Sequence, residues 1–151
     1  GGEVDALLAG GNEVDVFELP GALREFLRSK YADRPEVRII QDATLPGFAA
    51  IGRPGYDLVV SIDTIEHFHP DDFEPTLDAF LELLNRSGSI YVRNNFAQFD
   101  LYPMHFDHAA AWENWISSRL VRRTSVDPTT KAEWIQRDFV TVVVAEREAV
   151  A

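Results

Sequence analysis

The most informative segment of the sequence is Tyr56-Asp57-Leu58-Val59-Val60-Ser61-Ile62-Asp63-Thr64-Ile65-Glu66-His67. Within it, a mostly apolar run from Leu58 to Ile62 follows a turn at Pro54-Gly55 and stops at Asp63. This pattern predicts a strand that is buried on both faces. Open α/β sheets bind their ligands just outside the carboxyl ends of the strands. The stretch therefore places a carboxylate, and then His67, where such a fold would carry its chemistry.

Composition predicts an ordinary globular protein with a single domain over residues 1–151. Of the 151 residues, 46% are hydrophobic and 26% are charged, which suits one domain with a substantial core. There is no apolar run of bilayer-spanning length and no signal-peptide pattern, so we expect no membrane partner. The chain has no cysteine, which excludes disulfides and thiolate chemistry and is consistent with a cytoplasmic location.

The net charge of −11 bears on the class of partner. Nucleic-acid binders usually present a basic face to the phosphates, whereas the only basic cluster here, residues 119–123, is short and interrupted. We therefore expect no nucleic-acid partner and favour a small-molecule substrate.

Strand-like and helix-like segments alternate along the chain, a pattern that predicts βαβ units around a parallel sheet. The helix after this segment, residues 56–67, has the clearest signal, because Asp71 and Glu74 have capping-box spacing ahead of an apolar stripe. We expect strands at 14–19, 37–40, 58–62, 89–93, 120–126 and 139–145, and helices at 3–9, 22–31, 71–84 and from 107 onward.

Three consecutive strands of this pattern are each followed by, or end in, an acidic residue. Glu18 stands at the end of the first strand, Asp42 follows the second, and Asp63 follows the third. A carboxylate in the first position can accept hydrogen bonds from both hydroxyls of a ribose. Asp42 could reach an adenine amino group, and the small Ala43 leaves room for the ring. We expect the three acids to converge on one adenosine-shaped slot.

In these segments the chain resembles the class I S-adenosylmethionine-dependent methyltransferases. The family's fourth-strand motif commonly reads like FDLVVSLDVLEH, which corresponds to residues 56–67, and its LLKPGG-like wording before a strand corresponds to residues 83–92. The resemblance implies a Rossmann-like, doubly wound and mostly parallel sheet with helices on both faces and an antiparallel final strand. It also implies methyl transfer from S-adenosylmethionine to a small-molecule acceptor.

The resemblance also assigns cofactor-binding roles. Glu18, with Leu19 beside it, would hold the ribose, and Asp42 with Ala43 would contact the adenine. Asp63 would lie near the amino-acid end or the sulfonium of the cofactor.

Gly1 and Gly2 would be the end of the family's glycine-rich loop. The strand that precedes this loop in the family has no counterpart here, so we expect a domain that is incomplete at its amino terminus. Further domains of a longer chain, or a second copy, then stay open as macromolecular partners.

Histidines supply the candidate catalytic groups. His105 falls in the loop that borders the acceptor pocket in the family, and it could take a proton from an acceptor hydroxyl. His67 corresponds to the family's histidine after the fourth strand, which shapes the pocket. These histidines and His69 could also form a metal site with nearby acids (Asp63, Glu66, Asp71 and Asp107). Since no H-E-x-x-H helix or comparable arrangement is present, we expect no metal.

Two other functions remain open at this point. An NAD(P)-dependent oxidoreductase would also use Glu18 on a ribose, but it would not call for the Asp42-Ala43 pair. A non-catalytic methyltransferase-like domain that binds a partner would have a blocked or empty cofactor crevice. The sequence lacks the G-x-S-x-G elbow of hydrolases and the phosphate-binding G-x-x-x-x-G-K loop.

Overall fold

The computed structural model describes residues 2–40, 55–94, 96, 102–119, 122–126, 132–137 and 140–146, with side chains described up to residue 119. The chain forms two compact units, Gly1–Gly52 and Arg53–Ala151. The assignment of residues 1–151 to one domain stays a prediction. No helix in the described part of the chain is long and apolar enough to cross a membrane.

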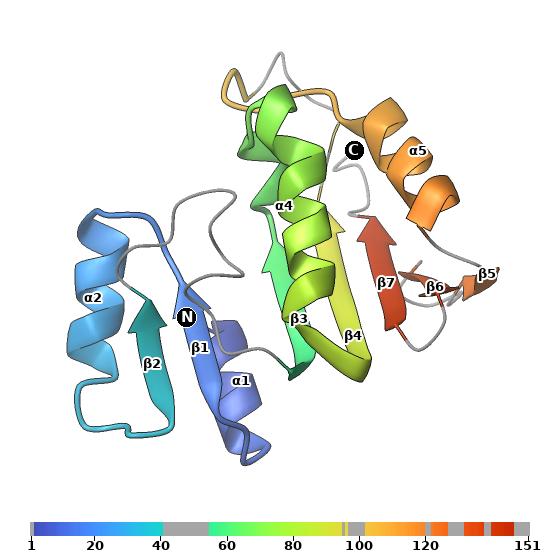
Figure 1. The fold of residues 1–151 in the computed structure, drawn as a ribbon. Helices are drawn as coiled ribbons and strands as arrows, with labels where there is room; N and C mark the ends of the chain where they lie inside the picture. The colour runs from blue at the N-terminus through green and yellow to red at the C-terminus, as the bar shows by residue number, and fades with distance from the viewer. Residues whose placement is uncertain are drawn as a thin grey trace. The chain divides into compact units, whose positions relative to one another are not determined.

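The first unit is a small βαβ arrangement. Strands β1 (Val14–Phe17) and β2 (Val37–Ile40) pair in parallel and are joined through α2 (Ala22–Lys30), while α1 (Gly2–Ala9) precedes them (Figure 1). Gly11 adopts a φ of 78° just after α1, a left-handed conformation that glycine tolerates at helix ends. The core of this unit comprises Leu8, Leu27 and Tyr31, with Val4, Val14, Val16, Val37 and Ile39 packed against them.

The second unit contains a five-stranded sheet in the order β3-β4-β7-β6-β5. The strands are β3 (Tyr56–Ile62), β4 (Leu84–Asn94), β5 (Arg122–Val126), β6 (Ala132–Arg137) and β7 (Val140–Glu146). Helix α4 (Pro70–Leu83) connects β3 to β4 and packs on both, and α5 (Ala109–Arg119) packs beside α4. The most buried apolar side chains described in this unit are Ile65, Phe73, Leu77, Ile90, Val92 and Trp115.

The α/β class is confirmed, with parallel strands and helices in both units. Strands β3, β4 and β7 are mutually parallel, as are β1 and β2. A doubly wound sheet with helices on both faces is not shown, because the strands lie in two separate sheets and the described helices of the second unit pack side by side. The finer Rossmann-like description stays a prediction.

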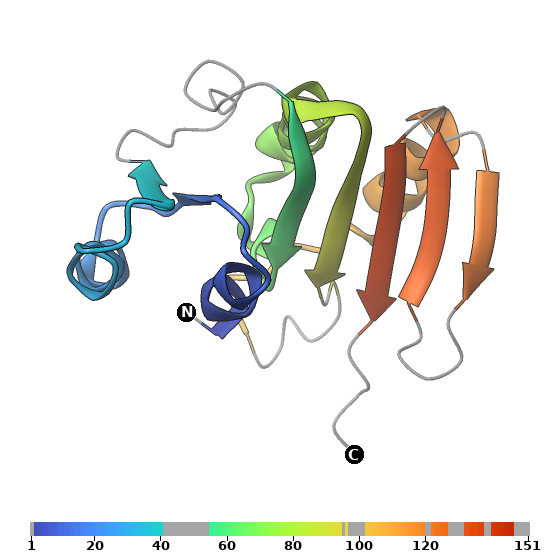
Figure 2. The ribbon, with the colours of Figure 1, turned by 90° about the horizontal axis from the view of Figure 1, so that it is seen from below.

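The expectation of an antiparallel final strand is wrong. Strand β7 runs parallel to β4 in the register Ser89↔Thr141 to Asn94↔Glu146, and β6 is the antiparallel strand beside it (Figure 2). The sequence pattern predicted two strands after α5, whereas the structure has three. Each hairpin reverses the chain direction, so the additional strand β6 restores β7 to the direction of β4.

Two local expectations are also corrected. Leu58 and Val60 are 42% and 37% exposed, so β3 is not buried on both faces. They lie two residues apart and therefore share a face of the strand, which the described helices of the second unit leave uncovered. In addition, α4 begins at Pro70 with His69 as its N-cap, because the His69 imidazole accepts a hydrogen bond from the Asp71 backbone N–H at 3.3 Å. The capping box from Asp71 to Glu74 is therefore not formed as predicted.

Candidate functional site

A sharp turn at the carboxyl end of β3 begins the site. Asp63 has a φ of 49°, in the left-handed region that few non-glycine residues adopt. Its backbone N–H donates to the Arg93 carbonyl at 2.8 Å, and the Thr64 hydroxyl donates to the Ile62 carbonyl at 2.9 Å. The chain then enters a short 3-10 helix, Ile65–His67, in which Ile65 is fully buried. This anchoring fixes the two residues that follow Ile65.

Residues 102–108 return to this turn and are held there by three hydrogen bonds. The Phe106 N–H donates to the Glu66 carbonyl at 2.8 Å, and His67 Nδ1 bonds the Met104 carbonyl at 3.2 Å. The third joins His108 Nε2 to the Phe68 carbonyl at 2.8 Å. His108 is 2% exposed and stacks on Phe73 with ring centroids 4.0 Å apart, so it is a core residue. The three bonds fix the position of His105.

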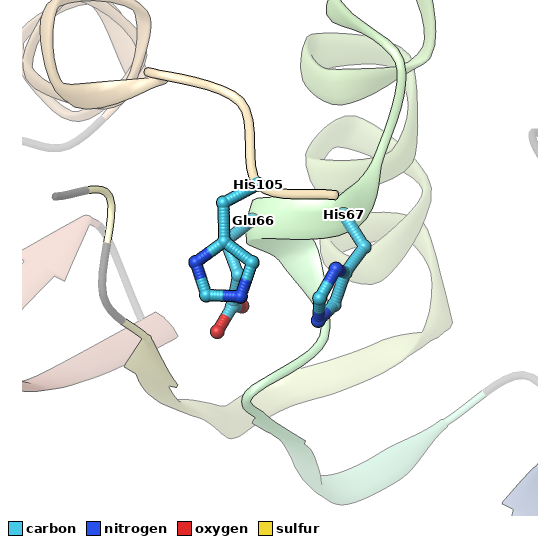
Figure 3. A group of neighbouring side chains, drawn as sticks. All are labelled: Glu66, His67 and His105. Carbon is cyan, nitrogen blue, oxygen red and sulfur yellow. The ribbon is translucent and has the colours of Figure 1, made fainter. Parts of the chain in front are cut away.

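The result is a cluster of Glu66, His67 and His105, which we call the Glu-His-His cluster. One side-chain ligand atom from each lies within 4.8 Å of the other two, and Figure 3 shows the three side chains converging beneath the 3-10 turn. The two imidazole rings meet edge to face with centroids 4.6 Å apart. The Tyr102 ring stacks on the His105 imidazole, with ring centroids 4.9 Å apart. Three groups able to exchange protons or bind a metal thus face one another.

Several buried polar atoms in this region have no hydrogen-bond partner in the described part of the chain. Glu66 is only 1% exposed, and its Oε2 atom has no hydrogen-bond partner among the described residues. The same holds for His105 Nδ1, and for three buried atoms on β3 and β4: Ser61 Oγ, Arg93 Nε and Asn94 Oδ1. A buried polar group without a partner costs about 1–3 kcal/mol. Such a concentration at the carboxyl ends of two parallel strands is typical of a site that receives a polar ligand.

Asp63 faces a cation from the neighbouring strand. Arg93 Nη2 lies 3.5 Å from Asp63 Oδ2, and each side chain is about one-third exposed. The guanidinium balances part of the carboxylate charge, so the pair offers both an acceptor and a donor to a ligand that carries both signs of charge.

The structure describes some of the remaining predicted cofactor residues and not others. Glu18 directly follows β1, and its Oε1 accepts a hydrogen bond from the Leu19 N–H at 2.9 Å, while the Leu19 side chain is 64% exposed. Gly2 is the first residue of α1. Gly1, Asp42 and Ala43 lie outside the described residues. Because Glu18 and Asp63 belong to different units, the adenosine slot that they would share stays a prediction.

Sequence reasoning did not single out Glu66 and gave no role to Arg93. Glu66 was only one of four acids near the histidines, and nothing local indicates that it is buried beside His105. Arg93 carried no role, although its position near the end of a predicted strand was a usable signal.

No protein-family model, curated protein or solved structure matches the chain.

Proposed function

We propose that this protein is a methyltransferase that uses S-adenosylmethionine and acts on a small-molecule acceptor in the cytoplasm. The observation that supports it best is the gathering of ionisable and unpartnered polar groups at the carboxyl ends of β3 and β4. Open α/β sheets bind nucleotide-like ligands at this edge. The sequence resemblance supplies the identity of the cofactor.

The residues present fit the polar groups of the cofactor. Asp63 and Arg93 together offer a carboxylate for an ammonium group and a guanidinium for a carboxylate, which are the two charges of an amino-acid end. Ser61 Oγ and Asn94 Oδ1 are buried atoms that a ligand could satisfy. Glu18 and Leu19 would hold the ribose, Asp42 and Ala43 the adenine, and Gly1 and Gly2 would approach the methionine portion.

The chemistry on the acceptor side would belong to His105. When bound, S-adenosylmethionine supplies an electrophilic methyl group on its sulfonium. His105 Nδ1, which has no partner in the described structure, would accept the proton that the acceptor hydroxyl or amine loses. General-base assistance of this kind is worth roughly 10² to 10⁴ in rate. His67 would border the acceptor, and positioning of the two reactants would supply a further part of the acceleration.

Calorimetric titration of the full-length protein with S-adenosylmethionine and with its demethylated product tests the proposal. We expect both to bind, and Asp63→Asn to weaken binding at least about tenfold, because a charge-assisted contact is worth about 1.5–3 kcal/mol. The matched control is Asp71→Asn, since Asp71 is an exposed acid at the start of α4 and should not affect the affinity. Absence of binding at millimolar cofactor, or binding of NAD(P) in its place, would refute the assignment.

The role of His105 is tested separately by kinetics with an acceptor found by screening. We expect His105→Gln to lower kcat by roughly 10² to 10⁴ while the affinity for S-adenosylmethionine stays within about threefold. The control is His69→Asn, which keeps an N-cap side chain on α4 and lies outside the Glu-His-His cluster. An unchanged kcat in the His105 variant would exclude it as the base.

A further inference from the structure

We infer that the Glu-His-His cluster is a binding site for a divalent transition-metal ion, for which Zn²⁺ is the best fit. The inference does not depend on the proposed methyl transfer, because it stands on the arrangement of three side chains in the second unit. It also revises the expectation that no metal binds, which rested on the absence of a known spacing in the sequence.

The donor set has the right chemistry. Two imidazole nitrogens and one carboxylate oxygen form the ligand set of many catalytic zinc sites and suit other divalent transition metals as well. Ligand atoms around a tetrahedral ion with bonds of 2.0–2.2 Å lie about 3.4 Å apart. The cluster, within 4.8 Å, is somewhat wider than this. A modest movement of the three side chains toward one another would close the set around an ion.

The surroundings orient at least one ligand as metal sites require. A carbonyl oxygen can only accept, so the contact with Met104 places the proton of His67 on Nδ1. The Nε2 lone pair of His67 is then free to face an ion. A histidine that ligates a metal usually donates its other N–H to a carbonyl or carboxylate in this way. The Phe106–Glu66 backbone bond and the stacking of Tyr102 on His105 hold the other two ligands near it.

The burial of Glu66 gives an independent reason for a cation at this place. A carboxylate that is 1% exposed, with one oxygen lacking a partner in the described structure, is expensive unless a positive charge compensates it. A bound divalent ion would supply that charge and would satisfy Glu66. Three protein ligands leave a fourth position open, as in catalytic rather than structural zinc sites. The overall charge of −11 favours the approach of a cation.

Metal titration of the full-length chain, stripped with a chelator and free of cofactor, tests this inference. We expect one Zn²⁺ per chain by calorimetry, and Co²⁺ to give the intense visible absorption of a four- or five-coordinate ion with nitrogen and oxygen ligands. Loss of an outer-shell partner alone typically costs 10- to 100-fold in affinity. Replacement of a ligand in Glu66→Gln, His67→Ala or His105→Ala should therefore weaken binding by about 100-fold or more.

Two features keep the test decisive. His67 is exposed, so His67→Ala should fold normally and provides the answer even if a Glu66 variant is unstable. The control, His69→Asn, removes a nearby imidazole outside the cluster and should leave the affinity within about threefold. Absence of binding, or affinities that fall equally in the control or in none of the ligand variants, would overturn the inference. Because an imidazole that holds the ion cannot also act as the base, a methyltransferase assay with and without chelator shows which role His105 has, and failure of either proposal leaves the other intact.

Discussion

Asp63 shows at the scale of one residue how the site is built into the backbone. A side chain at positive φ costs roughly 1–2 kcal/mol in the left-handed region, less for aspartate, and such conformations persist where the surrounding structure imposes them. In Asp63→Gly the strain is removed, whereas in Asp63→Ala it is kept, and both variants lose the contact with Arg93. We expect the glycine variant to be more stable than the alanine variant by about 1 kcal/mol in urea unfolding.

Asp57 provides the matched comparison for this prediction. It is an exposed residue inside the same strand, where glycine is entropically unfavourable. The order of stabilities should therefore be reversed there, with Asp57→Ala above Asp57→Gly. The same order at both positions would show that the backbone at Asp63 carries no strain.

A second residue-scale prediction concerns pH and the pair formed by Asp5 and Lys30. Their 2.6 Å hydrogen bond, with a further one from the Tyr31 hydroxyl, lowers the pKa of Asp5 below its usual 3.8. A carboxyl group whose pKa is lowered by folding stabilises the protein fully above the unfolded pKa, and this contribution is lost as the pH falls through the folded pKa. Asp5→Asn should therefore lower Tm at pH 6 to 7, with the difference from wild type shrinking as the pH falls below 3.8. A difference that persisted in acid would contradict the assignment.

At the scale of elements, α4 contains Pro75 in its interior, where proline destabilises a helix. Because the helix begins at Pro70, Pro75 lies beyond the first turn, where it cannot donate to the Asp71 carbonyl. Pro75 is exposed, so its replacement costs little packing. We expect Pro75→Ala to raise the free energy of unfolding by about 1–2 kcal/mol, after allowance for the entropy that proline removes from the unfolded chain.

Pro70→Ala is the control, since Pro70 occupies the first helical position, in which proline is well tolerated. This variant should change the free energy of unfolding by only a few tenths of a kcal/mol, in either direction. Equal gains at the two positions would mean that the helix begins later than the structure shows.

Asp78 joins α4 to α5. It accepts a hydrogen bond from the Trp115 indole N–H at 2.9 Å and two from the Arg119 guanidinium, which raise the pKa of that guanidinium. Trp115 is 1% exposed, so Asp78→Ala leaves a buried donor without an acceptor and should cost about 1–3 kcal/mol in denaturant unfolding. Asp78→Asn retains an oxygen for the indole and should cost less. If the two variants were equally stable, the indole contact would not matter.

Elements could be predicted from the sequence where their signals are local. The strands predicted from apolar runs and turn residues at 14–19, 37–40, 58–62 and 89–93 coincide with β1, β2, β3 and β4. Strand β6, Ala-Glu-Trp-Ile-Gln-Arg, is half polar and has no alternation, so its pairing partners rather than its own pattern make it a strand. The start of α4 was misread because Asp71 is a stronger cap by type than His69.

The site was predictable only in part, because its contacts are not local in the sequence. His67 and His105 were singled out from motif position, and the structure brings them together. Their proximity to a buried Glu66 depends on hydrogen bonds between segments about 40 residues apart, such as that of Phe106 with Glu66. Periodicity and spacing contain no information on such contacts.

At the scale of the whole molecule, the inferred metal site links two segments of the second unit and none of the first. Since a ligand that binds only the folded form stabilises what it touches, Zn²⁺ should slow amide exchange in residues 63–68 and 102–106. Peptides from β1, α2 and β2 should exchange at the same rate with and without the ion. Hydrogen-exchange mass spectrometry measures both, and protection spread evenly over the chain would contradict a local site.

The direction of β7 has a practical consequence for labelling. Because β7 is parallel to β4, with Glu146 in register with Asn94, the chain leaves the sheet on the side of the candidate site. A fluorophore coupled to a cysteine introduced at Glu146 would therefore lie at the same edge of the sheet as the carboxyl end of β4. Co²⁺ quenches nearby dyes, and such a conjugate would act as an optical reporter of ion arrival without any change to the ligands.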